Sequence, residues 1–404
     1  MRQFVLDEYQ TAVFGPTDAA LGPALAGTGL VATTLTVDGR LRLTADSKVG
    51  VVRLQAGEDT VEVRVRPKLP IGRLFWMLGH ARDDSGWRPE PADLATEHEL
   101  VPAVAVAFTA AASRALAPGV LQGYRVAEET LPTLRGRLRE ADQLRRRPGL
   151  ALPLEVRYDD YSVDIPENQI LRAAVDRLRR TDSVPAAARC GLHRLGQALA
   201  DVTRLPPGLP LPPVPVNRLT ARYGPALRLA RLILADDSVE HHSGTVRASG
   251  FVFDLNRVFE DWLTAVLRDV ITREHGGTVV AQHPAHLDER ATVPMYPDIT
   301  WWRQHRCLGV VDAKYKRTSG SSPPNGDLYQ MLAYCTTLGL AEGHLVYATD
   351  HEPEREYRLV GSGVRVMAHG LDLAGPLNEL RGQIERLADR VARAAVTARA
   401  NSAR

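Results

Sequence analysis

The feature that most constrains this chain is an apolar run that ends in an acid and a lysine. Residues 308–311, LGVV, lead directly into Asp312, Ala313 and Lys314. Four successive apolar residues predict a strand buried on both faces. Because side chains alternate along a strand, Asp312 and Lys314 share one face. A carboxylate and an ammonium at the end of such a strand cost free energy unless they pair or hold a metal ion.

A second carboxylate precedes this strand. Asp298 follows Pro297 and lies fourteen positions before Asp312. The segment ITWW after it and the turn RQHR predict a hairpin that brings Asp298 beside Asp312. Two carboxylates with water are a common way to hold Mg²⁺, and Lys314 can then orient or deprotonate a water or neutralise a phosphate. This set suits phosphodiester hydrolysis.

A purely structural explanation stays open for the same residues. Asp312 can form a surface ion pair with Lys314 or Lys316 on an ordinary edge strand, and Asp-x-Lys triplets occur often by chance. The Pro-Asp pair, its spacing and the apolar run favour the chemical interpretation.

Two flanking helices are expected to add further groups. The segment 250–276 predicts one long amphipathic helix, which carries Glu260 as a third acid. Downstream, DLYQMLAYC places Asp327, Gln330 and Tyr334 on one helical face, from which Gln330 can reach a metal-bound water or a phosphate. The alternative is that Glu260 and Gln330 are solvated helix positions.

The chain is expected to form three regions. Residues 1–120 predict a β-rich N-terminal domain, with hairpins over 30–45 and 49–68. Residues 121–240 predict a mostly helical middle region, in which 205–216 holds six prolines and forms a stiff spacer. Residues 241–404 carry the acids and end in a helix over 372–401 that packs on its own domain.

Arginines cluster in the middle region. Arg145, Arg146 and Arg147 follow one another, just before Pro148 and Gly149. Three adjacent guanidiniums can bind phosphates. A solvated helix end is the interpretation we favour.

Composition narrows the class of protein. The chain has 404 residues, of which 44% are hydrophobic and 24% charged, and its net charge of +2 is too small to indicate nucleic acid by itself. Its three cysteines lack metal-ligand spacing. The charged N-terminus is unlike a signal peptide, and the longest uncharged apolar stretch, 101–113, is too short to cross a bilayer. We therefore expect a cytoplasmic protein with no membrane partner.

The order of these residues resembles the PD-(D/E)xK nuclease superfamily, and within it the McrC family. The resemblance rests on Glu260, Pro297-Asp298, the segment DAKYK and the segment DLYQMLAY. VRPKLPIGRLFWML, RGRL, YDDYSVDIPENQIL, RYGPALRLARLIL and NRVFEDWL are also similar to McrC segments. The resemblance spans residues 60 to 350.

This resemblance implies a multidomain α+β or α/β chain with a restriction-endonuclease-like core, in which helices flank a mixed central sheet, over 241–404. It also implies roles for individual residues. Asp298, Asp312 and Glu260 become the Mg²⁺-binding acids, Lys314 the catalytic lysine and Gln330 the residue of the following helix.

The family resemblance further implies partners. The expected substrate is double-stranded, modified DNA, and the expected motor is an AAA+ GTPase of the McrB type, whose GTP hydrolysis the chain stimulates. The chain has no GxxxxGK[ST] segment, so it is not that motor. The N-terminal region 1–120 is the expected docking region, removable without harm to the nuclease core.

Two other functions stay open. The chain can be a non-catalytic adaptor that activates the motor, although such an adaptor has no need of the complete acid and lysine set. It can also be a stand-alone repair nuclease of the same superfamily.

Overall fold

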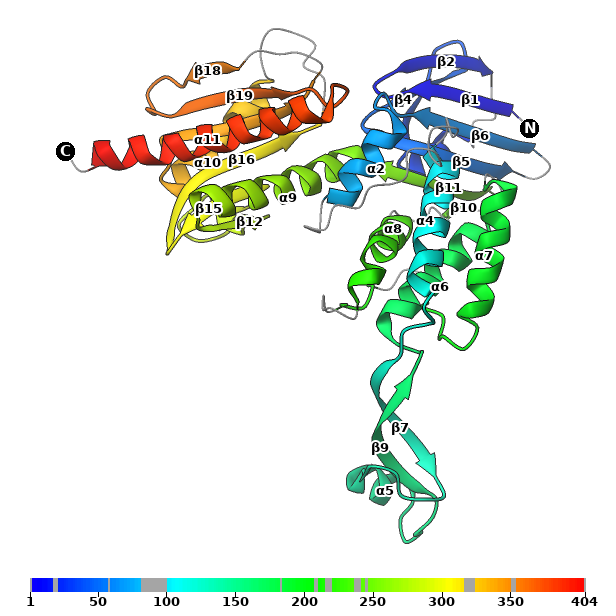
Figure 1. The fold of residues 1–404 in the computed structure, drawn as a ribbon. Helices are drawn as coiled ribbons and strands as arrows, with labels where there is room; N and C mark the ends of the chain where they lie inside the picture. Colours follow the sequence, from blue (N-terminus) through cyan, green and yellow to red (C-terminus); the bar gives the residue numbers. More distant parts are fainter. Residues whose placement is uncertain are drawn as a thin grey trace. The chain divides into compact units, whose positions relative to one another are not determined.

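The computed structural model describes residues 2–16, 21–56, 59–80, 100–181, 184–206, 210–214, 220–235, 241–243, 246–315, 324–349 and 354–402. The chain divides into two compact units. Unit 1 combines residues 1–100 with 239–404, and unit 2 consists of residues 101–238. The chain mixes α and β elements, as the sequence predicted (Figure 1), but the region 121–240, predicted to be mostly helical, also contains strands between residues 123 and 162.

A five-stranded sheet in unit 1 joins the N-terminal strands to a distant part of the chain. Its order is β1 (Arg2–Asp7), β6 (Asp59–Arg66), β5 (Lys48–Ala56), β11 (Val246–Asp254) and β10 (His241–Ser243). In β6, Val61, Val63 and Val65 are buried, as its alternating sequence predicts, but Glu62 on the other face is buried as well and pairs with Arg53 and Arg64. The antiparallel pairing of β5 with β6 confirms the second predicted hairpin, whose Gly57 and Glu58 lie outside the described residues.

A three-stranded sheet also lies in the N-terminal part. It consists of β2 (Thr11–Pro16), β4 (Arg40–Ala45) and β3 (Val31–Leu35), and the pairing of β3 with β4 confirms the first predicted hairpin. Two helices accompany these strands, α1 (Leu21–Gly27) and α2 (Ile71–His80).

The second large sheet of unit 1 carries the residues predicted to do chemistry. Its order is β12 (Thr278–Ala281), β15 (Ile299–Arg303), β16 (Arg306–Lys314), β17 (Glu342–Ala348), β19 (Arg365–Leu371) and β18 (Arg355–Arg358). β15 and β16 form the predicted hairpin, whereas β16, β17 and β19 are parallel. A short hairpin of β13 (Ala285–His286) and β14 (Pro294–Met295) precedes β15.

Helices cover both faces of this sheet. α10 (Asn325–Leu338) packs on β16 and β17, and its Met331 joins Val310 of β16 in one hydrophobic cluster. α9 (Leu255–His275) and α11 (Leu377–Ser402) pack together and against β16. Gly309 faces α11, because a Cβ there would meet Val391 at 2.8 Å, whereas the next residue, Val310, faces α10. The C-terminal helix thus packs on its own domain, as predicted.

The helix that carries Glu260 begins later than the sequence predicted. Residues 250–254 belong to β11, and α9 starts at Leu255 with Asp254 as its N-cap, where the Asp254 side chain accepts a hydrogen bond from Asn256 N. Phe251 and Phe253 are two residues apart, which is the period of a strand, and this segment pairs with β5 instead of extending the helix.

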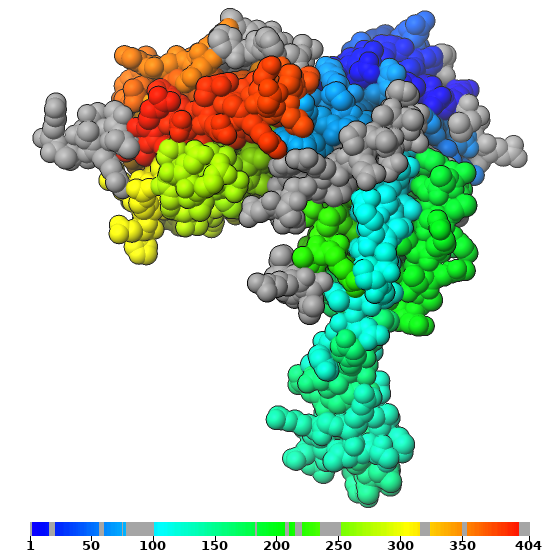
Figure 2. Space-filling view, in the orientation of Figure 1, coloured from blue at the N-terminus to red at the C-terminus, as the bar shows by residue number. Residues whose placement is uncertain are grey.

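Unit 2 consists of a helical bundle and a β-stranded arm. The helices are α4 (Leu100–Leu116), α6 (Pro166–Arg179), α7 (Ala186–Ala198), the 3-10 turn η1 (Ala221–Tyr223) and α8 (Gly224–Ala235). The arm contains β7 (Gly123–Leu131), β8 (Arg137–Leu138), α5 (Glu140–Arg146) and β9 (Leu154–Ser162). In space-filling view the arm extends from the helices of unit 2 as a narrow projection (Figure 2). The described parts of the proline-rich spacer, 205–206 and 210–214, have no regular structure.

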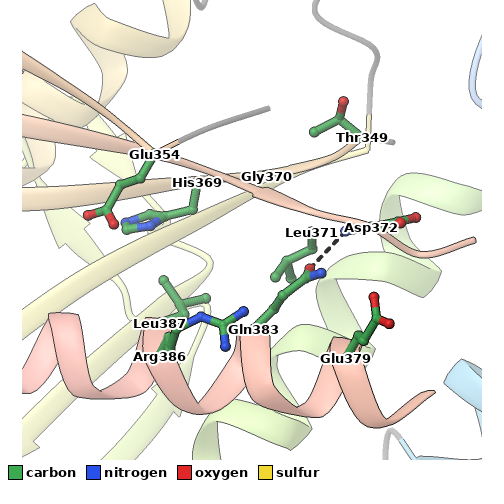
Figure 3. A pocket seen from close by; sticks show the side chains of 10 residues that line it. All are labelled: Thr349, Glu354, His369, Gly370, Leu371, Asp372, Glu379, Gln383, Arg386 and Leu387. Carbon is green, nitrogen blue, oxygen red and sulfur yellow. Dashed lines mark hydrogen bonds between the residues drawn. The ribbon is translucent and has the colours of Figure 1, made fainter. Parts of the chain in front are cut away.

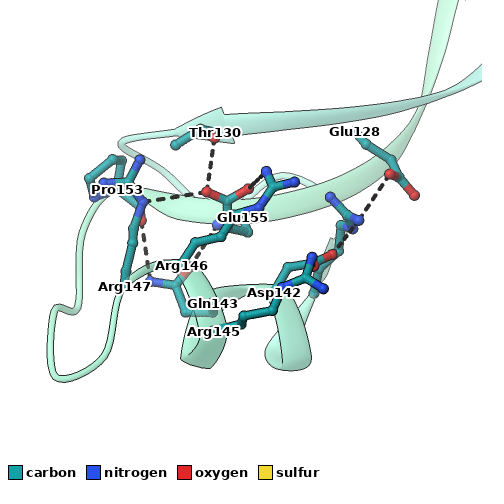
Figure 4. Close-up of polar contacts among 10 residues, drawn as sticks. Glu128, Thr130, Asp142, Gln143, Arg145, Arg146, Arg147, Pro153 and Glu155 are labelled. Carbon is teal, nitrogen blue, oxygen red and sulfur yellow. Dashed lines mark hydrogen bonds and ion pairs between the residues drawn. The ribbon is translucent and has the colours of Figure 1, made fainter.

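The adjacent arginines lie at the end of α5 and have acidic partners within the arm (Figure 4). Arg146 and Arg147 both face Glu155 of β9 at 3.4 Å, and Arg145 pairs with Asp142 at 2.7 Å. Burial raises the pKa of Glu155, but the Thr130 hydrogen bond and the two guanidiniums together hold that pKa below its usual value. The favoured interpretation was a solvated helix end, and Arg145 and Arg146 are indeed largely exposed, but the ion pairs with Glu155 add a structural role that it did not include.

We expect the variant Arg146→Ala with Arg147→Ala to loosen the arm, because it removes both cations from the buried Glu155. Limited proteolysis should then cut between residues 123 and 162 faster than in the unaltered protein. Arg145→Ala is the matched control, because its side chain is 72% exposed and its partner Asp142 retains Arg139. Equal cleavage rates for all three proteins would contradict this account of Glu155.

The N-terminal strands are tied to the acid-bearing sheet, which bears on the expectation that 1–120 is removable. β5 pairs with β11 along its whole length, and β11 leads directly into α9. The Tyr9 hydroxyl donates to the carbonyl of Tyr315, one residue after Lys314. Deleting residues 1–120 would remove the strand partner of β11 and the Tyr9 hydrogen bond. We therefore no longer expect this deletion to leave the nuclease core unharmed. Point changes are the better probes of this region.

Candidate functional site

The candidate site begins at the C-terminal end of β16. Asp312 is 1% exposed, and its carboxylate oxygen Oδ2 lies 2.5 Å from Lys314 Nζ. Both side chains share the sheet face on which Val310 packs against α10, as the alternation predicted. The structural pairing of Asp312 with Lys314 is therefore real, but it is buried rather than on the surface. Lys316, the other possible partner, lies outside the described residues.

Asp298 reaches the same place from the start of β15. The register pairs Ile299 with Val311, which puts Asp298 level with Asp312. Asp298 Oδ2 accepts a hydrogen bond of 2.9 Å from the backbone N–H of Ala313. The hairpin thus brings the two predicted carboxylates together.

The electrostatics of this pair are unfavourable without a cation. Burial, together with repulsion from Asp312 and Glu260, raises the pKa of Asp298 to about 8. Burial also raises the pKa of Asp312, although Lys314 opposes the increase. Burial lowers the pKa of Lys314, but the attraction of Asp312 outweighs it and the net pKa is raised. Lys314 is therefore an ammonium group at neutral pH.

Glu260 lies on α9 and is linked to Asp298 through the side chain of Gln282. The amide nitrogen of Gln282, which follows β12, donates to Glu260 Oε1 and also to Asp298 Oδ1, the latter at 3.0 Å. Burial raises the pKa of Glu260, the Gln282 hydrogen bond opposes this, and Asp261 and Asp312 add to the increase. Glu260 belongs to the cluster, with one amide group between it and Asp298.

Gln330 of α10 contacts the lysine rather than the acids. Its Oε1 accepts a hydrogen bond of 2.9 Å from Lys314 Nζ, and its Nε2 donates to the Tyr334 hydroxyl at 2.8 Å. Burial and the nearby acids, Asp312 first, raise the pKa of Tyr334 to about 12. This relay fixes the position of the Lys314 ammonium. The other residue of the predicted helical face, Asp327, accepts a hydrogen bond from Tyr347 at 2.7 Å instead.

The donor set fits a divalent cation at Asp298 and Asp312. Asp312 Oδ2 is buried and, beyond its ion pair, accepts no hydrogen bond. An oxygen of this kind is costly unless a cation uses it. Hard cations such as Mg²⁺ take carboxylate oxygens. Burial first, and for Asp298 also the repulsion of Asp312 and Glu260, raises the pKa of each acid, although Lys314 opposes both increases.

Gln282 is the site residue that the sequence did not indicate. It lies in the stretch AQHP, which has no recognisable site pattern, and its role depends on a backbone φ of 47°. A polar side chain directly after a short strand was the only available signal.

Unit 1 also contains a pocket and a second acidic cluster, and both are separate from the candidate site. A pocket of about 540 Å³ lies between β19 and α11, and there Gln383 accepts a hydrogen bond from Asp372 N (Figure 3). None of the predicted site residues lines it. In the described part of the chain, one set of three acid or histidine ligand atoms lies within 4.8 Å of one another, and it consists of Glu274, His275 and Asp389. The carboxylate oxygens of Glu260, Asp298 and Asp312 therefore do not all lie within 4.8 Å of one another.

Comparison with known proteins adds independent information. A family model described as McrBC 5-methylcytosine restriction system component matches residues 43–348. No curated protein matches the chain. A chain from a half-complex of the tetradecameric assembly of Thermococcus gammatolerans McrB AAA+ hexamers with bound McrC is 18% identical, with a TM-score of 0.57, over 96% of this chain and 100% of that chain.

A chain from the cryo-EM structure of the Thermococcus gammatolerans McrBC complex is also similar. It is 19% identical, with a TM-score of 0.40, over 67% of this chain and 88% of that chain. Of the two structural similarities, the first supports a shared fold.

Within the described residues, every helix is too short or too polar to span a bilayer. The family match covers three quarters of the chain, includes Glu260, Asp298, Asp312, Lys314 and Gln330, and confirms the family that the sequence resembled. The chain therefore belongs to the McrBC 5-methylcytosine restriction system component family.

Proposed function

We propose that this protein is a Mg²⁺-dependent DNA endonuclease subunit of a McrBC-like restriction and defence system. Its substrate is double-stranded, modified DNA, and its reaction is hydrolysis of the phosphodiester bond. The domain that performs it, 241–404, has a PD-(D/E)xK core. A mixed sheet with α9 and α11 on one face and α10 on the other supports this assignment.

The observation that carries the proposal is the convergence of Asp298, Asp312 and Lys314 from two adjacent strands. Neighbouring strand ends place two carboxylates and one ammonium together, and a buried oxygen of Asp312 accepts no hydrogen bond beyond its ion pair. A surface ion pair would show none of this burial. When bound, Mg²⁺ would polarise the phosphoryl oxygen and lower the pKa of a water.

The chain's own groups define the remaining chemistry. Asp298 and Asp312 would hold the cation, and Glu260 would complete the acidic set through the amide of Gln282. In the metal-free protein Lys314 carries a proton at Nζ, and this ammonium can act as a cation and hydrogen-bond donor toward the phosphate. Gln330 keeps this ammonium pointing at the site.

We propose an AAA+ GTPase of the McrB type as the partner. The solved structure of McrB AAA+ hexamers with bound McrC, which shares the fold, supports this partner. In this proposal the chain stimulates GTP hydrolysis by the motor, docks through residues 1–120, and works in the cytoplasm.

Reconstitution tests the proposed function. The protein is mixed with a McrB-type AAA+ GTPase of the same organism, with Mg²⁺ and GTP, and with methylated or unmethylated DNA. The proposal expects cleavage that needs all components. GTPase stimulation without cleavage would indicate an adaptor, and cleavage without the motor would indicate a stand-alone nuclease.

We expect Ca²⁺, a non-catalytic probe of the site, to bind more tightly as the pH rises toward 8. A proton on Asp298 competes with the cation below the raised pKa of about 8, so affinity should increase by up to about tenfold per pH unit. Isothermal titration at pH 6, 7 and 8 measures this. An affinity that does not change with pH would contradict it.

In the metal-free protein, Asp298 should make the folded state less stable as the pH rises. Its pKa is raised from the ordinary 3.8 to about 8, so the folded state binds the proton more tightly than the unfolded state. The contribution of Asp298 to stability therefore falls as pH rises from about 4 to 8. Thermal unfolding without metal should show this decrease, and added Ca²⁺ should reverse it.

A further inference from the structure

Gln282 occupies a backbone conformation that L-residues rarely adopt. It follows β12 with φ of 47°, in the left-handed region. A non-glycine residue is strained there, because its Cβ comes close to the following carbonyl oxygen. Strain of this kind persists where the surrounding structure gains from the side chain's placement. The backbone N–H of Gln282 also donates to the carbonyl of Asp298 at 3.0 Å, which fixes the residue beside the site.

The strained backbone directs the side-chain amide between two acids that repel each other. Nε2 donates to Glu260 Oε1 on α9 and to Asp298 Oδ1 before β15. An amide NH₂ has two hydrogens, and both are used here. No other described side chain donates a hydrogen bond to both carboxylates. Without this link, no described hydrogen bond would hold the Glu260 carboxylate beside Asp298.

We propose that Gln282 is a positioning residue that ties Glu260 to Asp298 and so orients both carboxylates before a cation binds. This inference rests on the proposed function, because it treats these acids as the metal-binding set. Gln282 acts through Glu260 and Asp298, in the way that outer groups orient metal ligands elsewhere.

The alternative role of the amide is competition. Its nitrogen lies where positive charge would be favourable, so it could instead hinder the cation. The two roles predict opposite changes in affinity when the side chain is removed, which makes them separable by titration.

Calcium titration of the full-length protein provides the first test. We expect Gln282→Ala to weaken Ca²⁺ binding by about tenfold or more. Gln282→Asn should weaken it similarly, because asparagine tolerates the left-handed conformation but is too short to reach both acids. Gln304→Ala is the matched control, since Gln304 is exposed, has φ of 56° and lies at the β15–β16 turn. Its Ca²⁺ affinity should be unchanged.

A double-mutant cycle shows whether Gln282 acts through Glu260. If it does, the double variant Gln282→Ala, Glu260→Gln should bind Ca²⁺ more tightly than the two single-variant effects multiplied together would predict. Multiplicative effects, unchanged affinity or tighter binding in Gln282→Ala would each overturn the proposal. Tighter binding would identify the amide as a competitor.

The crystal structure of metal-free Gln282→Ala gives a readout that does not depend on metal binding. We expect the Glu260 carboxylate to turn away from Asp298 in this variant. A carboxylate that stays in place would overturn the positioning role. If the unaltered protein bound no Ca²⁺ at all, the proposed metal site would fail, and this structure would still decide whether Gln282 orients Glu260.

Discussion

Replacing Asp312 by asparagine is expected to reduce DNA cleavage by about 10³-fold or more, because a metal ligand contributes several kcal/mol and each 1.4 kcal/mol is tenfold. The asparagine side chain would keep the shape of the buried carboxylate but lose the negative charge that holds the cation. Folding should survive, because asparagine has nearly the same volume and Lys314 keeps its hydrogen bond to Gln330. GTPase stimulation of the motor should also persist, because the docking region is separate in the proposal.

The measurement is single-turnover cleavage of methylated DNA by the reconstituted complex. Asp269→Asn is the control for loss of an acid, because Asp269 is 54% exposed on α9 and pairs only with Arg273 among the described residues. It should cleave normally. Cleavage by Asp312→Asn at an undiminished rate would remove this residue from the mechanism.

Replacing Lys314 by methionine is expected to slow cleavage strongly while leaving the metal site able to bind a cation. The ammonium is the one cation that contacts Asp312 in the described structure, and its loss should slow cleavage by about 10²–10³-fold. It should also destabilise the metal-free protein by on the order of 1–3 kcal/mol, because a buried carboxylate loses its partner.

Calcium should reverse that destabilisation. A cation at Asp298 and Asp312 would replace the missing positive charge, so Ca²⁺ should raise the melting temperature of Lys314→Met more than that of the unaltered protein. The double variant Asp312→Asn, Lys314→Met removes both charges of this ion pair and should show neither effect. Equal Ca²⁺ shifts in all three proteins would contradict the assignment of Lys314 as the partner of a metal ligand.

The local geometry of the site could be predicted from the sequence because it depends on short-range rules. Strand alternation put Asp312 and Lys314 on one face, and a short turn between two apolar segments brought Asp298 alongside. Helical spacing likewise placed Gln330 within reach of the site. None of these inferences required knowledge of distant contacts.

Features that depend on distant pairing were not predictable in the same way. Residues 250–254 became a strand because β5, about two hundred positions earlier, offers a partner edge. The same pairing joins residues 1–100 and 239–404 into one compact unit. Gln282 was missed because its contacts require a left-handed backbone that nothing in AQHP specifies.

The central claim is that Asp298 and Asp312 hold a divalent cation that this protein needs to hydrolyse DNA. Anomalous diffraction from crystals soaked in Mn²⁺ tests it most directly, with Asp312→Asn crystals as the comparison. The account predicts an anomalous peak at metal–ligand distance, about 2.0–2.6 Å, from carboxylate oxygens of both residues, and its loss in the variant. A peak elsewhere, or none between these two carboxylates, would contradict it.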